Sequence, residues 1–412
     1  MITCGIVSEF NPFHRGHSEL IRQIRDKFSD RVGIVTVMSA SFTQRGEPAL
    51  YDTSHRVRAA LREGVDLVIE IPVNFVLDSA ESFATAGIQL LQASGVVQNL
   101  AYGSEDSESP LLLKEVAAFL ADENFEFKSL LDQNIRLGMG FAAARQAAVS
   151  ECMKNKAAGE LLAHSNSILA VEYEKAIIKS GSSLESYPLA LYRKDKFSAN
   201  RIRELTAEAC AVDLEHAKGE LLRTLHPYMT ATSLAELILA YQKGEAPVFL
   251  SDFAPLIYSQ EIWRDRESLK EIQGMQGGLA DRFVNQLKKL DVTLSSTNFY
   301  NFLDSVATRS FPLSRVRRAF LSAILGIRQE DSFNSEVSFL RILGFSKRGR
   351  TLLRYMKDSA TLPVITRSAD WRQVDGDRAL LQMEQCFAAG NLWKSGLRQS
   401  HKLEETRQIV QI

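Results

Sequence analysis

The residues best suited to chemistry lie near the N-terminus, at positions 11–17, which read Asn-Pro-Phe-His-Arg-Gly-His directly after the apolar run Ile2–Val7. The imidazoles of His14 and His17 could donate hydrogen bonds where charge develops on a reacting phosphate. The proline and the glycine suit a tight crossing from a strand to a helix. A helix that starts near Gly16 would aim its free backbone N–H groups and its positive dipole end at the same point. The run therefore predicts a nucleotide-phosphate site.

Two plainer interpretations of this run compete with the phosphate site. One is a helix start that is capped by an imidazole, but a cap needs no second His, Gly and Pro beside it. The other is a pair of metal ligands, but no third ligand of the usual kind stands nearby in the sequence. We therefore expect a nucleotide site here and no metal site.

The elements that must position these residues alternate between strand-like and helix-like segments, which predicts an α/β fold with an open, mainly parallel sheet. The strand-like segments are Ile2–Val7, Val32–Met38, Val65–Ile71, Val96–Tyr102 and Leu184–Tyr192. The helix-like segments are Ser18–Phe28, Thr53–Arg62, Ser79–Ala93, Leu111–Leu120, a longer region to about Cys152, Ser165–Ser180 and Ser198–Leu205. Ligands of such sheets bind at the carboxyl ends of the strands. His14, Gly103 and Arg193 each come near such an end, so we expect them to converge on one crevice.

From about residue 206 the pattern changes to long apolar-periodic segments, and runs of β-branched residues become rare. The segments are Ala209–Leu225, Ser233–Tyr241, Ser268–Leu290, Asn298–Val306, Ser314–Leu325, Arg348–Met356 and Ala379–Ala389. The sequence thus predicts two domains, a nucleotide-binding domain over residues 1–205 and a mostly helical domain over residues 206–412.

The composition points to an ordinary globular protein. The 412 residues are 45% hydrophobic and 24% charged, with a net charge of -1, which excludes a globally basic nucleic-acid coat. No apolar run approaches the roughly 20 residues that cross a bilayer, so we expect no membrane partner. The cysteines at positions 4, 152, 210 and 386 form no CxxC pair. Reduced thiols in the cytoplasm are the simplest account of them.

Other candidate site residues each have a structural alternative. Arg193 could clamp phosphate oxygens or be an exposed charge at a strand end. Gly103 could let adenine or ribose approach or serve a tight turn. Asn166 could contact a nucleotide or cap its helix, and Ser198 could cap a helix whose N-terminus binds phosphate.

Two loops carry further candidates. Gln44 and Arg45 lie in a loop marked by Gly and Pro after the second strand, where they could contact substrate or face solvent. Glu105 and Asp106 could hold a metal through water, although two acids in a loop usually face solvent.

Basic side chains gather in two places. The first cluster is Arg309, Arg315, Arg317 and Arg318, and the second is Arg341, Lys347, Arg348, Arg350, Arg354 and Lys357, with Tyr355 interleaved. A near-neutral protein would need such local patches to grip an RNA backbone. A solvated helix face is the plainer interpretation of each cluster alone.

Residues 9–17 resemble the HxGH motif of the nucleotidyltransferase superfamily, and the chain as a whole resembles the bacterial tRNA(Met) cytidine acetate ligase family. Four further stretches carry the closer resemblance in the expected order: Phe42–Ala49, Tyr102–Glu105, Asn166–Tyr173 and Arg341–Phe345. The chain departs from the family pattern at Ser165-Asn166-Ser167, where Pro-Asn-Asn is usual, and at Asn200, which replaces a threonine.

The resemblance implies a Rossmann-like nucleotidyltransferase sheet and an enzyme that joins ATP and acetate into acetyl-adenylate, with release of pyrophosphate. The acetyl group would pass to the exocyclic amine of the wobble cytidine in elongator tRNA(Met), which leaves N4-acetylcytidine and AMP. His14 and His17 would be catalytic and would act on the phosphates. The residues implied to bind ATP are Val7, Ser8, Glu9, Phe10, Asn11, Pro12, Phe13, His14, Arg15, Gly16, His17, Ser18, Glu19, Leu20, Gly103, Asn166, Arg193 and Lys194. A requirement for Mg²⁺ and a homo-oligomeric state stay open.

Two other functions compete with this ligase. In the first, a phosphorylated metabolite attacks ATP and the helical half serves dimerisation, which describes a small-molecule adenylyltransferase. In the second, the protein binds RNA in response to ATP without turnover. The long helical half with its basic clusters favours RNA over a metabolite, and the intact HxGH motif argues against an inactive site.

Overall fold

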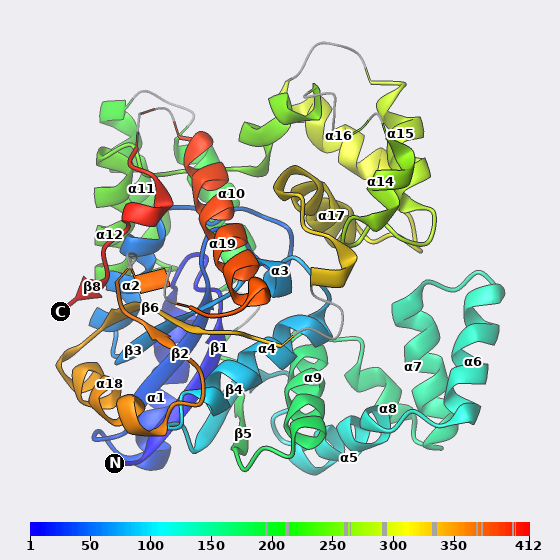
Figure 1. Ribbon diagram of the computed structural model, residues 1–412, viewed down its shortest axis with the longest axis horizontal. Coiled ribbons are helices and arrows are strands. Elements are labelled where there is room, and N and C mark those ends of the chain that lie inside the picture. The colour runs from blue at the N-terminus through cyan, green and yellow to red at the C-terminus, as the bar shows by residue number, and fades with distance from the viewer. Residues whose placement is uncertain are drawn as a thin grey trace.

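The computed structural model describes residues 1–193, 197–210, 214–258, 263, 265–290, 295–331, 336–367, 370–371, 374–397, 399 and 401–412. Within them, five parallel strands form most of a larger sheet and extend to one of its edges (Figure 1). They are β1 (Thr3–Ser8), β2 (Gly33–Ser39), β3 (Leu67–Ile71), β4 (Asn99–Ser104) and β5 (Glu185–Ala190), in the order β5-β4-β1-β2-β3. The predicted α/β fold with a mainly parallel sheet is confirmed, and the ends of the strands differ from the predicted ones by up to three residues.

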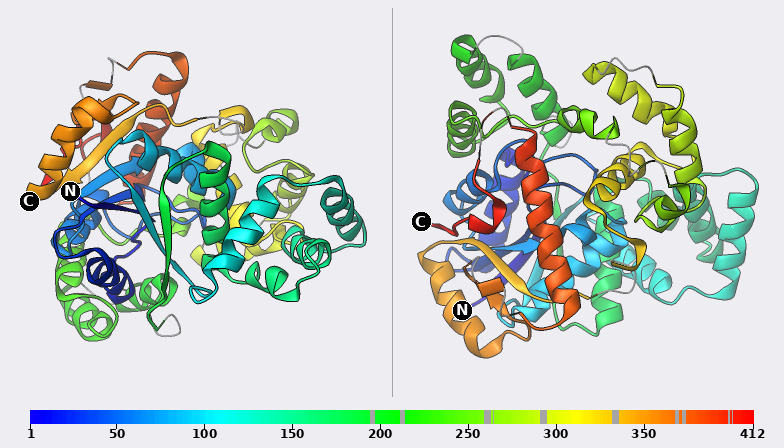
Figure 2. Two further views of the ribbon diagram at one scale, coloured as in Figure 1. Left: turned by 90° about the horizontal axis from the view of Figure 1, so that it is seen from below. Right: turned by 45° about the horizontal axis from the view of Figure 1, so that its top comes forward.

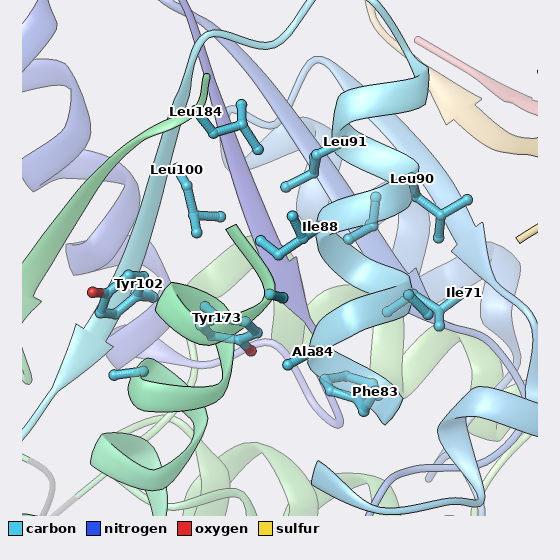
Figure 3. Close-up of a cluster of buried hydrophobic side chains, with 14 of the residues drawn as sticks. Ile71, Phe83, Ala84, Ile88, Leu90, Leu91, Leu100, Tyr102, Tyr173 and Leu184 are labelled. Carbon is cyan, nitrogen blue, oxygen red and sulfur yellow. The ribbon is translucent and has the colours of Figure 1, made fainter. Parts of the chain in front are cut away.

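Successive side chains of these strands point to opposite faces, and helices bury both faces. Cys4, Ile6, Ile34 and Met38 pack with α1 (Arg15–Phe28) and α2 (Thr53–Arg62). The opposite face packs against α4 (Ala80–Ala93), α5 (Pro110–Ala121) and α9 (Ser165–Ser180), as Figure 3 shows for Leu100 of β4 beside Ile88 and Leu91 of α4. This two-sided burial explains why the strands read as nearly continuous apolar runs.

The remaining helices extend the molecule on several sides. They are α3 (Val73–Val76), α6 (Phe125–Arg136), α7 (Phe141–Cys152), α8 (Lys156–Leu161), α10 (Ala199–Ala209), α11 (Leu214–Leu225), α12 (Ala231–Gln242), α14 (Arg266–Glu271), α15 (Leu279–Leu287), α16 (Ser296–Val306), α17 (Leu313–Leu325), α18 (Lys347–Ser359) and α19 (Asp377–Ser395), with short 3₁₀ helices at Leu250–Tyr258, Gln329–Asp331 and Glu404–Thr406. The predicted single segment Ser268–Leu290 is two helices, because Gly274, Gly277 and Gly278 between them adopt positive φ. In Figure 1, α6 and α7 form a projecting lobe.

The second half of the chain contributes strands that the sequence analysis did not predict. β6 (Leu340–Phe345) pairs antiparallel with β3, while β7 (Val364–Ile365) and β8 (Val410–Gln411) pair with β6. Figure 2 shows β6 and α18 of the C-terminal part beside the N-terminal strands. The second half, predicted to be mostly helical, therefore also contributes strands to the sheet of the first half. The boundary between residues 205 and 206 stays a prediction.

A buried ionic network fixes the C-terminal part to the sheet. Arg341 of β6 contacts Glu70 of β3 at 2.6 Å and Glu404 at 3.2 Å. Arg407 contacts the same Glu404 at 2.5 Å and also Asp52, the N-cap of α2, at 3.0 Å. Burial alone would raise the pKa of Glu404, but Arg407, Arg341 and Lys394 together lower it to about 2. Arg341 was placed in a predicted RNA-binding cluster, and this is wrong because its guanidinium is committed to buried carboxylates.

This network predicts a loss of stability in acid. The pKa of Glu404 in the folded protein lies below its ordinary value of 4.5. The stabilisation that ionised Glu404 gives to the fold is therefore complete above pH 4.5 and is lost as the pH falls towards 2. The shift corresponds to roughly 3 kcal/mol of unfolding free energy. Urea unfolding between pH 7 and pH 3 should show this fall, and Arg407→Gln should flatten it. A fall of the same size in Arg407→Gln would contradict the assignment.

Two simpler expectations concern cysteines and membranes. None of the four cysteines, all of which lie among the described residues, forms a disulfide, as their spacing predicts. Among the described helices, none combines the length and the apolar character that spanning a bilayer requires.

Candidate active site

The order of the strands places a crevice at the carboxyl end of β1. β2 follows β1 on one side and β4 lies on its other side, so the direction of chain progression reverses there, which is where open α/β sheets bind ligands. The paired ends Ser8 with Met38 and Ser104 with Ala190 show that these strands finish at one edge. The segments that carry His14, Gly103 and Arg193 therefore belong to the neighbouring strands β1, β4 and β5, as the sequence predicts.

The two imidazoles begin α1 and stack on each other. Their ring centroids are 3.7 Å apart. His14 is the N-cap, and its Nδ1 accepts a hydrogen bond from the backbone N–H of Gly16 at 3.1 Å. His17 Nδ1 accepts one from the backbone N–H of His14 at 3.2 Å. The argument that a cap needs no second imidazole is therefore wrong, because the second ring completes a reciprocal capping box.

This capping fixes the chemistry of both rings. A ring nitrogen that accepts a hydrogen bond carries no proton, so each neutral imidazole holds its proton on Nε2. Burial lowers the pKa of His14 to about 4, and burial together with His14 lowers the pKa of His17 well below its usual value. Within the described part of the chain, neither Nε2 has a hydrogen-bond partner. The pair thus offers two neutral N–H donors to a ligand.

A buried arginine holds the loop between β1 and α1 in place. Arg56 of α2 donates hydrogen bonds to the backbone carbonyls of Glu9, Phe10, Ser39 and Ala40, so it ties together the carboxyl ends of β1 and β2. Sequence reasoning missed this residue. The signal was a charged residue on the buried face of a helix, since Arg56 is fully buried beside Val57 and Ala60.

The same loop is joined to the loop after β2. The side chain of Asn11 donates to the carbonyl of Pro48 at 3.1 Å and accepts from the backbone N–H of Leu50 at 2.7 Å. The rings of Phe10 and Phe13 lie 5.0 and 5.5 Å from the ring of His17. These contacts fix the position of the histidine loop and of the His17 ring.

Arginines of the first basic cluster hold the loop after β2. Arg317 pairs with Glu47, which also pairs with Arg203 of α10 at 2.6 Å. Arg318 donates to the carbonyl of Gln44 at 2.7 Å, and Arg315 donates to the carbonyls of residues 274 and 276. These three side chains bind the protein itself, which corrects both the RNA-binding and the solvated-face interpretations for them. Arg309 is exposed.

The start of α9 binds the acidic residues that follow β4. Glu105 accepts hydrogen bonds from the backbone N–H of Ser167 at 3.0 Å and from the side chain of Asn166 at 3.2 Å. Asp106 accepts from the hydroxyl of Ser167 at 2.6 Å. The N-cap of α9 is His164, so the alternative that Asn166 caps the helix is wrong. Among the described residues, no group of three or more His, Cys, Asp or Glu could hold a metal ion.

Gly103 and the segment after β5 complete the list of predicted residues. Gly103 lies inside β4, so the tight-turn alternative is wrong, and a Cβ there would meet the side chain of Leu191 at 2.5 Å. A larger residue here would therefore collide with Leu191, and the contact of Gly103 with a nucleotide stays a prediction. The exposed Arg193 adopts a φ of 42°, and Lys194 lies outside the described residues. Ser198 caps α10 by accepting from Arg201 N–H, as predicted.

The helices after residue 198 cover one side of the histidine loop. The carbonyl of Tyr228 accepts from the backbone N–H of Arg15 at 3.0 Å, and the hydroxyl of Ser233 donates to the carbonyl of Phe13 at 2.7 Å. A groove of about 440 Å³ opens beside this contact, lined by Leu205, Glu208, Ala209, Glu220, Arg223, Thr224, Pro227 and Tyr228. Sequence reasoning missed Ser233 and Tyr228, because backbone contacts of this kind leave no pattern.

Part of the second basic cluster forms an exposed stripe. Lys347, Arg350, Arg354 and Lys357 are exposed and follow helical spacing along one face of α18. The N-terminus of α18 contacts Asp66, just before β3, so the helix starts at the amino ends of the parallel strands. The stripe and the histidines therefore lie at opposite edges of the sheet.

Comparisons with known proteins agree with this geometry. A family model described as HIGH Nucleotidyl Transferase matches residues 1–407. Similar curated proteins named tRNA(Met) cytidine acetate ligase include one from Caldanaerobacter subterraneus subsp. tengcongensis, which is 31% identical over 399 residues and 93% of each chain. Another, from Fervidobacterium nodosum, is 32% identical over 91% of this chain and 86% of its own length.

Two solved structures of a related protein are also similar to this chain over nearly its whole length. A crystal structure of Thermotoga maritima TmcAL bound with alpha-thio ATP has a TM-score of 0.87 and 30% sequence identity, over 97% of this chain and 95% of that chain. The apo form of the same protein has a TM-score of 0.89 at 28% identity and covers both chains completely. The chain therefore belongs to the HIGH nucleotidyl transferase family and, within it, to the tRNA(Met) cytidine acetate ligases.

Proposed function

We propose that this chain is an ATP-dependent ligase that activates acetate as acetyl-adenylate and transfers the acetyl group to the exocyclic amine of the wobble cytidine of elongator tRNA(Met). The stacked pair His14 and His17, with both Nε2–H groups directed away from their own helix cap, is the observation that carries the proposal. The names of the relatives supply the substrate, and the relative bound with alpha-thio ATP supplies the nucleotide.

The two steps of the reaction require different properties of the active site. In the first, an acetate oxygen attacks the α-phosphorus of ATP and pyrophosphate leaves. Negative charge moves onto the departing phosphates, and fixed neutral donors such as the two imidazoles stabilise it without rearranging. In the second, the cytidine amine attacks the acetyl carbonyl and AMP leaves. Because the anhydride also reacts with water, the site has to be closed to solvent between the steps.

The remaining predicted ATP contacts keep their places in this proposal. Asn166 stands at the start of α9, and its side chain donates to Glu105, which directly follows the carboxyl end of β4. Arg193 follows β5 with an exposed guanidinium that is suited to phosphate oxygens. Gly103, Lys194 and the other residues of the run 7–20 also stay predictions, and the proposed reaction belongs to the cytoplasm, where tRNA is modified.

The tRNA has to contact more than the crevice. The stripe Lys347, Arg350, Arg354 and Lys357 suits a phosphate backbone, but it lies at the edge of the sheet away from the histidines. We propose that it binds a part of the tRNA that is distant from the anticodon. The helical segment that contacts the histidine loop, through the carbonyl of Tyr228 and the backbone N–H of Arg15, would lie nearer to the target base.

Transfer of labelled acetate into tRNA is the experiment that tests the function. With ATP, elongator tRNA(Met) and labelled acetate, we expect label in the tRNA and N4-acetylcytidine at the wobble position after nuclease digestion. Initiator tRNA is the control without label. Label without ATP, or ATP consumption without label in tRNA, would contradict the proposal, and the second result would favour a small-molecule adenylyltransferase.

A further inference from the structure

One carboxylate in the crevice has no ion-pair partner. Glu9 directly follows β1 and precedes the histidine loop. Its Oε1 accepts a hydrogen bond from the backbone N–H of Gln44 at 2.6 Å. Within the described residues, its Oε2 has no hydrogen-bond partner, and this oxygen is not fully buried. The carboxylate is therefore held by one oxygen and open to a ligand at the other.

Three of the arginines near Glu9 are committed elsewhere, whereas the exposed Arg45 acts on the charge of Glu9 without forming an ion pair with it among the described contacts. Arg56 binds backbone carbonyls, Arg203 pairs with Glu47 at 2.6 Å, and Arg318 donates to a backbone carbonyl at 2.7 Å. A partly buried carboxylate is usually paired with a cation, so an unpaired one in a crevice indicates a task other than stability.

Glu9 lies between the two sides of the crevice, which are the histidine loop and the edge formed by β4 and α9. On one side, the ring of its neighbour Phe10 is 5.0 Å from the ring of His17. On the other side is Tyr173 of α9, whose pKa is raised by burial and also by the charge of Glu9. Figure 3 shows Tyr173 beside Tyr102 of β4, and their ring centroids are 5.6 Å apart. A group bound at Oε2 would thus lie between the phosphate donors and the edge formed by β4 and α9.

We propose that Glu9 is the general base of acetyl transfer, and that its Oε2 accepts a proton from the exocyclic amine of the target cytosine. This assignment rests on the proposed function. In this step the amine nitrogen bonds to the acetyl carbon, and the bond from that carbon to the phosphate oxygen breaks. AMP leaves with the electron pair, and one amine proton moves to Glu9. No other reactant is required.

Two physical arguments support this role. A carboxylate is the usual acceptor for the amine of cytosine, so the same oxygen selects this base. Burial raises the pKa of Glu9, although the N–H of Gln44 and nearby arginines oppose the rise. A base whose pKa is closer to the working pH transfers protons more effectively.

Glu9→Gln tests the assignment, because it keeps the volume and the acceptor for Gln44 N–H but removes the base. Acetate-dependent exchange of pyrophosphate into ATP measures the first step, and labelled acetate in tRNA measures the second. We expect transfer to slow by roughly 10²–10⁴-fold, far more than exchange. Wild-type transfer should rise with pH and reach a plateau, whereas the variant should lack that rise. Asp26→Asn, an exposed carboxylate at the end of α1, is the matched control and should leave both steps unchanged.

The alternatives give distinct results. Equal losses of exchange and transfer would show that Glu9 serves ATP and would overturn the assignment, as would transfer at the wild-type rate. If Glu9→Gln fails to fold, Glu9→Asp takes its place and should slow transfer while exchange persists. A wild-type protein that exchanges pyrophosphate but never labels tRNA would refute the proposed function itself, and the assignment would fall with it.

Discussion

Replacing His14 by alanine is expected to slow acetate-dependent exchange of pyrophosphate into ATP by roughly 10²–10³-fold. The reason is the loss of one fixed Nε2–H donor at the point where charge develops on the leaving phosphates. The variant should also lose about 1 kcal/mol of stability, because the side chain of His14 caps α1 by accepting from Gly16 N–H. Exchange kinetics and thermal unfolding measure the two effects separately.

His14→Asn separates the cap from the catalytic donor. Asparagine is a favourable N-cap, so the stability of wild type should return. Its shorter side chain does not reach the position of Nε2, so exchange should stay as slow as in the alanine variant. His17→Gln is the parallel test, since glutamine at the third helical position also completes a capping box. Recovery of exchange in either variant would reduce the imidazoles to helix caps and remove the main support for the proposed function.

The sequence was most informative where local chemistry and local structure agree. The five parallel strands follow from apolar runs, and the start of α1 follows from Pro12 and Gly16. The cap at Ser198 follows from a hydroxyl before a helix. Even so, the role of His14 was judged incorrectly in one respect. A cap and a phosphate donor were treated as alternatives, yet one imidazole has two nitrogens and can be both.

The residues that could not be predicted act over long distances in the sequence. β6 was missed because it carries Arg341, which reads as a surface charge until its partners Glu70 and Glu404 are known. Arg317 and Arg318 read as an RNA-binding patch for the same reason, although they bind the loop after β2. Charge alone does not reveal whether a side chain faces solvent or a distant carboxylate.

The second large effect that we expect is a loss of stability when the buried ion pair between Arg341 and Glu70 is broken. Arg341→Met should lower the free energy of unfolding by about 3–5 kcal/mol, because it leaves the buried carboxylate of Glu70 without its cation. A loss of this size is a large fraction of the total stability of a typical domain. Chemical denaturation at pH 7 measures it.

The double variant Arg341→Met with Glu70→Gln identifies the cause. It removes the unpaired charge and should recover a substantial part of the loss, since Glu404 keeps Arg407 and Lys394 as partners. Burial already raises the pKa of Glu70, and without Arg341 it should rise further. A raised folded-state pKa means that protonation stabilises the fold, so the deficit of the single variant should shrink as pH falls from 7 to 5. A deficit that is independent of pH and unchanged by Glu70→Gln would show that Arg341 stabilises β6 by packing rather than by charge.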